Sequence, residues 1–388
     1  MIALPGRKRK YYFAPAIMKA KSKFSFIDRI VLCVNGLLWI ALLISYLAPY
    51  IDPRKAWVIA FFGLAFPLLI TANLILLVYW LLRKPVFALI SIIVMACGWH
   101  VLSGSIGFRA AGNDLSKPKE QQVIRLITYN VHNFKRYGAV NDNSTKHEIL
   151  QLISGQQPDI IGFQEFYTRK QGQYDMCDSL KKILKTDYYY FEPFTFNSSE
   201  AIGMAVFSKF EIVAKGLIHL SDAKGSGNQC LYIDVKKGDK IFRVYSIHLQ
   251  SIRFDPEDYK YLNMVSEQGK PDMLSTRRIG SKLKNAFIRR SAQVDKIKEH
   301  AAQCPYPFII SGDFNDTPSS YAVNQMNKGL KNAFREKGSG FGRTYNGNFP
   351  NYQIDYIMTS PQFDVADYNI IPKKLSDHYP VRSDLVLR

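Results

Sequence analysis

Long apolar runs dominate the first 110 residues of the chain. Residues 30–51, 56–82 and 85–107 contain no Asp, Glu, Lys or Arg. A helix that crosses the hydrocarbon core of a bilayer needs about 20 apolar residues, because its backbone polar groups bond within the segment. The pattern therefore predicts three transmembrane helices, at about 30–51, 56–82 and 85–107, and a membrane anchor over residues 1–110.

The pattern changes after residues 111–122, which are polar, hold Gly, Pro and Ser, and are typical of a linker. From residue 123 onward, short β-rich runs alternate with segments of helical spacing. The expected strands are 124–131, 159–166, 308–315, 353–360, 364–371 and 379–387, with further strands between 202 and 248. The expected helices are 144–156, 173–185 and 283–302, and residues 251–282 are expected to be a long polar connection that shapes access to a site. Residues 123–388 are thus predicted to form one α/β domain.

Charge supports this division and predicts an orientation. The first 110 residues carry 13 Lys or Arg and two acids, and the chain as a whole has a net charge of +19. Eight of these basic residues precede the first apolar run, and an excess of Lys and Arg marks the cytoplasmic side of a membrane protein. We therefore expect a cytoplasmic N-terminus, and three crossings then place the α/β domain on the other side.

Chemically capable side chains follow the apolar runs of the second part, where the end of a strand meets a loop. Strand ends of α/β sheets converge on a crevice, so these residues are expected to lie together. They are Asn130, Glu165, His248, Asp313, Asn315, Asp355, Asp377 and His378.

This set of residues suits the hydrolysis of a phosphate ester. Glu165 is the best candidate ligand for a hard cation such as Mg²⁺. Asp313 or His378 would act on the attacking water, and Asn130, Asn315 and His248 carry donors for phosphoryl oxygens. Asp355 is expected to orient His378.

The motifs TYNVHNF, FQEF, SIHLQS, SGDFNDTPSS, QIDYI and SDHYPV, in this order, resemble the endonuclease/exonuclease/phosphatase superfamily, also called DNase-I-like. The resemblance covers about residues 123–388 and looks closest to a membrane-anchored bacterial branch, which implies the bacterial inner membrane. It implies a four-layer α/β/β/α sandwich, preceded here by the three transmembrane helices.

The resemblance also implies a role for each residue. Glu165 would be the main Mg²⁺ ligand, assisted by Asn130 and Asp377, with Mn²⁺ an alternative ion. Asp313 would position or deprotonate the water, Asn315 would hold the phosphate, and His248 and His378 would contact it, with Asp355 behind His378. Arg290 and Gln293 match the family's R-x-x-Q and are candidate substrate contacts.

The expected activity is a membrane-anchored, divalent-metal-dependent phosphoesterase, with a phosphodiesterase favoured. The substrate stays open between nucleic acid and a phospholipid or inositol phosphate. The basic stretch RRIGSKLKNAFIRR at 277–290 would suit nucleic-acid phosphates or anionic lipids. A non-catalytic membrane adaptor that keeps the fold is the alternative, and no protein partner is evident in the sequence.

Overall fold

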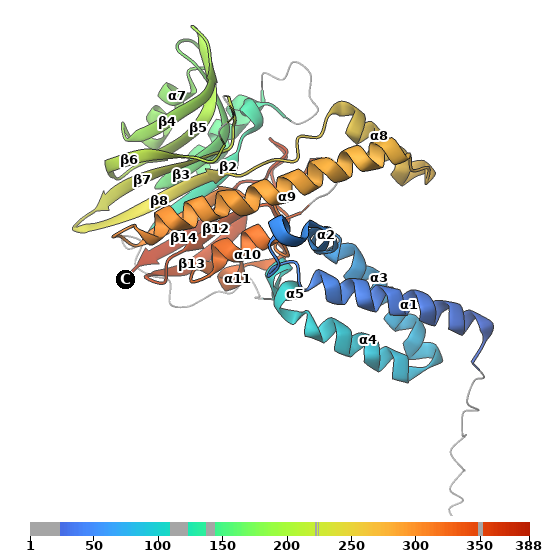
Figure 1. The fold of residues 1–388 in the computed structure, drawn as a ribbon. Coiled ribbons are helices and arrows are strands. Elements are labelled where there is room, and N and C mark those ends of the chain that lie inside the picture. The colour runs from blue at the N-terminus through green and yellow to red at the C-terminus, as the bar shows by residue number, and fades with distance from the viewer. Residues whose placement is uncertain (1–23, 109–122, 137–143, 222, 224, 348–351) are drawn as a thin grey trace, which may run out of the picture.

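The chain folds into a small helical bundle that abuts a two-sheet sandwich (Figure 1). The structure is a computed structural model and describes residues 24–108, 123–136, 144–221, 223, 225–347 and 352–388. The expected linker at 111–122 lies outside these residues. The bundle is built from α1 (Phe26–Ser45), α2 (Pro53–Leu64), α3 (Phe66–Arg83), α4 (Pro85–Cys97) and α5 (Trp99–Ser105).

The bundle differs from three uniform spans. Only α1 and α3 are single helices long and apolar enough to cross a membrane, whereas α4 and α5 are bent by 66° and would have to act together as a third span. The expected helix at 56–82 is divided between α2 and α3, because the chain leaves α2 at Leu64 and restarts with Pro67 in the first turn of α3. Proline lacks a backbone donor, so it starts a helix more readily than it continues one.

Polar side chains cross-link the helices of the bundle. The Trp80 indole donates a hydrogen bond of 2.7 Å to the Asn35 side chain, whose amide donates in turn to Asn73. At the end of α3, Arg83 donates to the fully buried Asp28 of α1 at 2.9 Å. Such contacts satisfy polar groups that hydrocarbon would leave without partners, and they fix how α1 packs against α3.

The sandwich consists of two six-stranded sheets. The first has the strand order β13-β14-β2-β3-β5-β4 and the second β10-β12-β9-β8-β7-β6. The strands of the first sheet are β2 (Val123–Asn130), β3 (Ile160–Arg169), β4 (Tyr189–Phe196), β5 (Glu200–Ser208), β13 (Phe363–Ile370) and β14 (Val381–Leu387). Those of the second are β6 (Glu211–His219), β7 (Gln229–Lys237), β8 (Lys240–His248), β9 (Phe308–Asp313), β10 (Lys331–Asn332) and β12 (Asp355–Thr359).

Helices cover both outer faces and complete four layers. The core between the sheets takes apolar side chains from both of them, for example Leu126 and Val206 against Leu231 and Ile309. A second core lies under α6 (Thr145–Gln156) and α7 (Met176–Leu184), and a third under α9 (Met273–Ala302) and α10 (Tyr321–Asn327). The remaining helices are α8 (Pro256–Gln268) and α11 (Ala333–Lys337), with a single 3-10 turn at His132–Phe134.

The segment 251–282 is largely helical, contrary to the sequence prediction of a long connection. It holds α8 and the first ten residues of α9, a helix that begins at Met273 rather than at 283. Asp255 and Asp272 cap these helices with their side chains. Strong caps allow helices to start in a polar stretch without an apolar periodicity, which is why the pattern alone does not reveal them.

The bundle is joined to the sandwich by side chains of both parts. Phe61 of α2 packs edge-on against Phe287 of α9 with ring centroids 5.4 Å apart, and Lys284 lies 4.7 Å over the Trp57 ring. The short strands β1 (Ile106–Phe108) and β11 (Ser339–Phe341) pair antiparallel. The helices of the bundle are therefore packed on the sandwich and not merely tethered to it.

Candidate active site

The polar residues expected at strand ends meet in one pocket at the edge shared by the two sheets. The parallel pairs β2–β3 and β8–β9 set Asn130 beside Gln164 and His248 beside Asp313. The antiparallel pair β12–β9 sets Asp355 beside Asp313. The pocket encloses about 240 Å³, and Asn130, Glu165, His248, Arg290, Asp313, Asn315, Asp377 and His378 line it.

A bulge in β3 turns Glu165 into this pocket. The pairing of β3 with β5 shifts between Phe163 and Phe166, and Glu165 has a φ of 51°. Positive φ is unfavourable for a residue with a Cβ, and such strain is concentrated at functional sites. The bulge lets Gln164 stay between the sheets, hydrogen-bonded to Thr128 and Ser246, while its neighbour faces the pocket.

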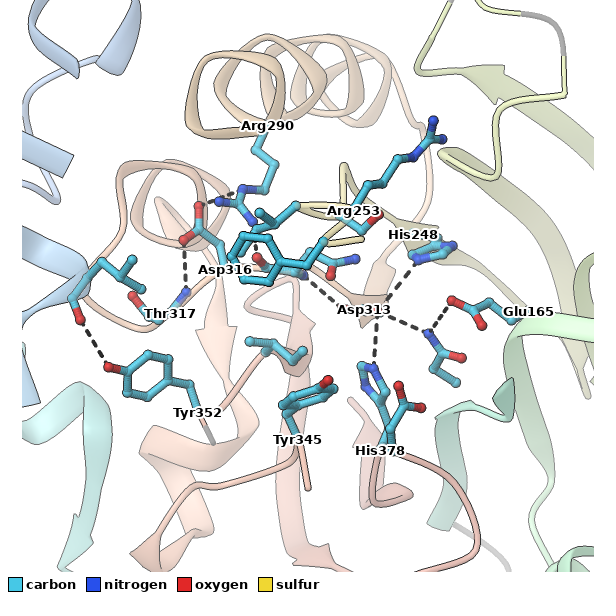
Figure 2. A pocket seen from close by; sticks show the side chains of 18 of the residues that line it. Glu165, His248, Arg253, Arg290, Asp313, Asp316, Thr317, Tyr345, Tyr352 and His378 are labelled. Atoms are coloured by element: carbon cyan, nitrogen blue, oxygen red, sulfur yellow. Dashed lines mark hydrogen bonds and ion pairs between the residues drawn. The ribbon is translucent and has the colours of Figure 1, made fainter. Parts of the chain in front are cut away.

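Asp313 lies at the centre of the site, as Figure 2 shows. One of its carboxylate oxygens accepts a hydrogen bond of 3.2 Å from the Asn130 amide and lies 3.6 Å from Nε2 of His248 and 3.7 Å from Nε2 of His378. The residue before it is Gly312, where a Cβ would collide with the backbone of Ile247. Burial raises the pKa of Asp313 to about 6, although the two nearby histidines oppose this rise.

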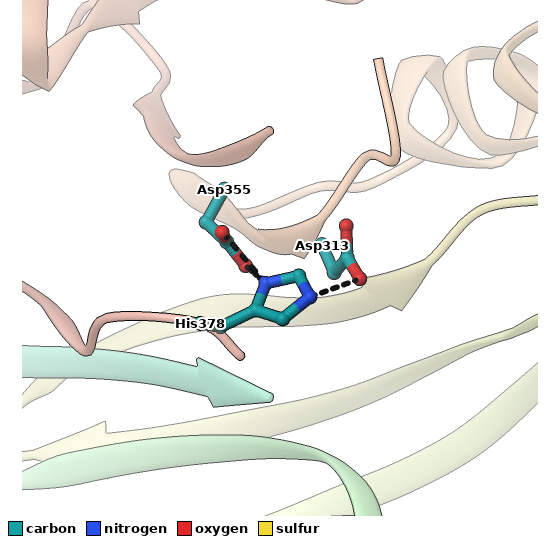
Figure 3. Close-up of side chains that lie close together, drawn as sticks. All are labelled: Asp313, Asp355 and His378. Atoms are coloured by element: carbon teal, nitrogen blue, oxygen red, sulfur yellow. Dashed lines mark hydrogen bonds and ion pairs between the residues drawn. The ribbon is translucent and has the colours of Figure 1, made fainter. Parts of the chain in front are cut away.

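Asp355 holds His378 from the other side. Its two oxygens lie 3.0 and 3.2 Å from Nδ1 of His378, and both side chains are buried (Figure 3). Burial opposes protonation of the imidazole, but the Asp355 and Asp313 carboxylates outweigh it and raise the pKa of His378 well above its ordinary value. His378 is therefore held as an imidazolium between two carboxylates.

Glu165 and Asp377 both line the pocket and both lie close to His132. Their carboxylates lie 3.5 and 3.7 Å from Nδ1 of His132, and the Asn130 amide lies 3.4 Å from Glu165. Enclosure in the pocket disfavours a charge on Glu165, but the bond to His132 and the field of His248 and His378 outweigh it and lower the pKa of Glu165 to about 2. Two carboxylates are hard donors, which fits a cation such as Mg²⁺, whereas the Oδ1 atom of Asn130 accepts a hydrogen bond from the backbone of His132.

A second group of potential ligands lies within the same site. Asp313, Asp355 and His378 each offer one ligand atom, and these atoms lie within 4.8 Å of one another. Because Nδ1 of His378 is already paired with Asp355, we interpret this group as a proton-sharing unit. The Glu165 side is then the better place for a metal ion.

The two residues of the R-x-x-Q motif behave differently. Arg290 lines the pocket but is almost fully buried, and it forms an ion pair of 3.0 Å with the buried Asp316. Its guanidinium also donates to the carbonyl of Asn315, so it holds the loop after β9. Gln293 lies behind the pocket wall, where it accepts from the backbone of Gln250 and donates to the carbonyl of Leu220.

The pocket and its immediate surroundings contain residues that the sequence reasoning missed. His132 follows Asn130 by two positions in a left-handed turn, and the quoted motif TYNVHNF already contained it. Tyr345 packs edge-on against His378 with ring centroids 5.3 Å apart, and Arg253 also lines the pocket. Neither Tyr345 nor Arg253 lies in a strand-end motif, so no pattern in the sequence pointed to them.

The sequence pattern of the "Endonuclease/Exonuclease/phosphatase family" matches residues 127–378. The chain belongs to this family. A second pattern, described as a domain of unknown function, matches residues 28–105. No curated protein matches the chain significantly.

Solved structures of this family resemble the sandwich. The endonuclease/exonuclease/phosphatase from Beutenbergia cavernae is 18% identical with a TM-score of 0.50, over 69% of this chain and 72% of that one. The human Nocturnin catalytic domain with bound sulfate is 16% identical with a TM-score of 0.47, over 69% and 95%. A mannosyl-6-phosphatase from Bacteroides thetaiotaomicron is 18% identical with a TM-score of 0.43, over 68% and 100%. The first of these supports the DNase-I-like fold, and the family as a whole acts on phosphate esters, generally with a divalent metal.

Proposed function

We propose that this member of the endonuclease/exonuclease/phosphatase family is a membrane-anchored hydrolase that cleaves a P–O bond with the help of Mg²⁺ or Mn²⁺, and that a phosphodiester is its favoured substrate. The observation that carries the proposal is the position of Asp313. It lies within hydrogen-bonding or ion-pairing reach of Asn130, His248 and His378, with Glu165 across the same pocket.

The charge and position of each side chain in the pocket indicate its role in the reaction. Asp313 holds the attacking water and accepts a proton from it, since its pKa of about 6 leaves it ionised near neutral pH. His378, kept cationic by Asp355, and His248 donate to the phosphoryl oxygens, where negative charge accumulates. Asn315, after β9, faces the pocket as a further contact for the phosphate.

Glu165, Asn130 and Asp377 would hold the metal ion. When bound, such an ion neutralises phosphoryl charge and orients the substrate. The chain's own residues on this side would present the carboxylates of Glu165 and Asp377, which the β3 bulge and the His132 contact hold in place.

The arrangement of the helical bundle supports an orientation of the chain across the membrane. The Phe26 end of α1 and the sandwich lie at opposite ends of the bundle (Figure 1). Together with the basic residues before α1, this arrangement supports a cytoplasmic N-terminus and a catalytic domain on the extracytoplasmic side, in a bacterial inner membrane. The non-catalytic adaptor is less well supported, because the pocket brings all the proposed metal and phosphate contacts together.

The test is hydrolysis of bis(p-nitrophenyl) phosphate by the full chain in amphipol. We expect turnover that depends on Mg²⁺ or Mn²⁺, stops with EDTA and is lost in Asp313→Asn. Asp187→Asn is the matched control, because the Asp187 side chain is 89% exposed. Turnover that persists in EDTA, or that survives in Asp313→Asn, would contradict the proposal.

A further inference from the structure

The membrane anchor supplies part of the active-site wall. Leu64, the last residue of α2, lines the same pocket as Asp313 and His378. Its carbonyl accepts a hydrogen bond of 3.3 Å from the Tyr352 hydroxyl, and the carbonyl of Gly63 accepts one of 2.8 Å from Ser319. The break between α2 and α3 is therefore bonded to the rim of the site (Figure 2).

A second cleft begins where this rim ends. It encloses about 230 Å³ between α3, α5 and the loops of the sandwich, and it shares Thr317 and Tyr352 with the catalytic pocket. Its walls are mainly apolar and include Phe66, Pro67, Ile70, Leu102, Ile106 and Phe341. A polar catalytic pocket and an apolar cleft thus adjoin at two common residues.

The cleft lies beside α3, a helix whose outer surface is apolar. The exposed apolar side chains of α3 are Leu68, Leu74, Ile75, Val78, Leu81 and Leu82. Large exposed apolar surfaces mark contact with a membrane or a partner, and α3 is long and apolar enough to cross a bilayer. Because Pro67 and Thr71 of the same helix line the cleft, its mouth lies beside the hydrocarbon that surrounds α3.

The catalytic pocket is itself divided into two halves. Glu165, Asp313 and His378 line it with polar groups, whereas Leu64 of α2 and Phe287, which packs on Phe61 of α2, line it with apolar ones. A substrate that is charged at one end and apolar at the other matches this division. A nucleic acid, which is charged along its whole length, does not.

The basic stretch at 277–290 also does not present an unoccupied basic surface to which nucleic acid could bind. Arg278 pairs with Asp258 at 2.7 Å, and Lys282 pairs with Asp255 and Asp258 at 2.6 Å. Lys284 lies over the Trp57 ring, and Arg290 is buried against Asp316. Four of the six basic side chains in this stretch are thus occupied within the fold.

We propose that the substrate is a phosphate ester carried by a membrane lipid, with its phosphate in the catalytic pocket and a hydrocarbon chain in the apolar cleft. This inference rests on the proposed phosphoesterase function. In the reaction the oxygen of water forms a new bond to phosphorus, the P–O bond to one alcohol breaks, and a proton from the water ends on the leaving oxygen.

The experiment measures whether hydrocarbon chains add affinity beyond the phosphate. The full chain in amphipol, without added lipid, hydrolyses bis(p-nitrophenyl) phosphate in competition with dihexanoyl phosphatidic acid or with glycerol 3-phosphate. These two competitors share a phosphomonoester on glycerol and differ in their acyl chains. We expect the inhibition constant of the lipid to be at least tenfold lower.

Variants of the apolar cleft test whether the lower inhibition constant of the lipid arises from binding in the cleft. Thr71→Trp fills the cleft and should reduce the ratio of inhibition constants to below three, while kcat/KM for the soluble substrate stays within twofold. Leu68→Trp is the matched control, since Leu68 is 60% exposed on the same helix and does not line the cleft. Phe341→Ser, on the opposite wall, should act like Thr71→Trp and serves if that variant does not fold.

Each outcome decides between the proposals. Equal inhibition by the two competitors, or an advantage that both cleft variants retain, would overturn the lipid inference and leave the phosphoesterase in place. Metal-dependent inhibition by DNA or RNA fragments stronger than that by the lipid would favour nucleic acid instead. If the wild-type chain shows no metal-dependent hydrolysis, the proposed function is overturned, and the lipid inference with it.

Discussion

Replacing Arg290 by Met should destabilise the protein more than any exposed substitution on the same helix. The Arg290 and Asp316 side chains are 1% and 5% exposed, and their charged groups are 3.0 Å apart. Removing one partner of such a buried pair leaves the other charge desolvated, which costs about 3–5 kcal/mol. For a domain of this size, 1 kcal/mol lowers Tm by about 2–4 °C, so we expect a fall of about 6–20 °C.

The assay is thermal unfolding of the full chain in amphipol, followed by tryptophan fluorescence and circular dichroism. Arg289→Met is the control, because Arg289 is exposed one position earlier on α9 and should shift Tm by no more than about 2 °C. Asp316→Asn should also destabilise, and the double variant Arg290→Met, Asp316→Asn should be less destabilised than the sum of the two changes. An unchanged Tm in Arg290→Met, or strictly additive losses, would refute a buried pair as the main role of Arg290.

Four further predictions concern chemistry and location. Asp313→Asn should lower kcat by about 10²–10⁴-fold without lowering Tm, measured on bis(p-nitrophenyl) phosphate. His378→Ala and Asp355→Asn should each lower kcat, but the double variant should lose little more than His378→Ala alone, because Asp355 acts through His378; losses that multiply would contradict this role. Glu165→Gln should raise the Mg²⁺ concentration needed for half-maximal rate, and an unchanged metal titration would argue against Glu165 as a ligand. Alkaline phosphatase fused after Arg388 should be active if the domain is extracytoplasmic, and activity only from a cytoplasmic reporter would reverse the orientation.

The α/β character of the domain could be read from the sequence because its strands are buried and their ends are marked, whereas the four layers were implied only by the family resemblance. Runs such as IRLITY and FIISG are mostly apolar, and each is followed directly by a polar residue, Asn130 or Asp313. The register of β8, β9 and β12 then places His248, Asp313 and Asp355 side by side. Local patterns sufficed here because strand ends of one sheet necessarily meet at one edge.

Features that depend on contacts between distant segments could not be read in this way. The break between α2 and α3 lies inside an apolar run of 27 residues, where Pro67 marks the restart but only the structure shows that Phe61 of α2 packs on Phe287 of α9. The early start of α9 depends on the Asp272 cap, and the burial of Arg290 depends on Asp316 in a loop of another layer. Hydrophobic periodicity carries no information about such pairings.

The contact between anchor and sandwich has a practical consequence for biochemistry on this protein. A fragment that begins after the anchor would lose Leu64 from the pocket wall and would uncover Phe287 and Tyr352. Such a fragment would expose an apolar surface next to the groups of the candidate site. We therefore expect truncation to lower solubility and to alter substrate preference. The kinetics of such a fragment would therefore differ from those of the full chain.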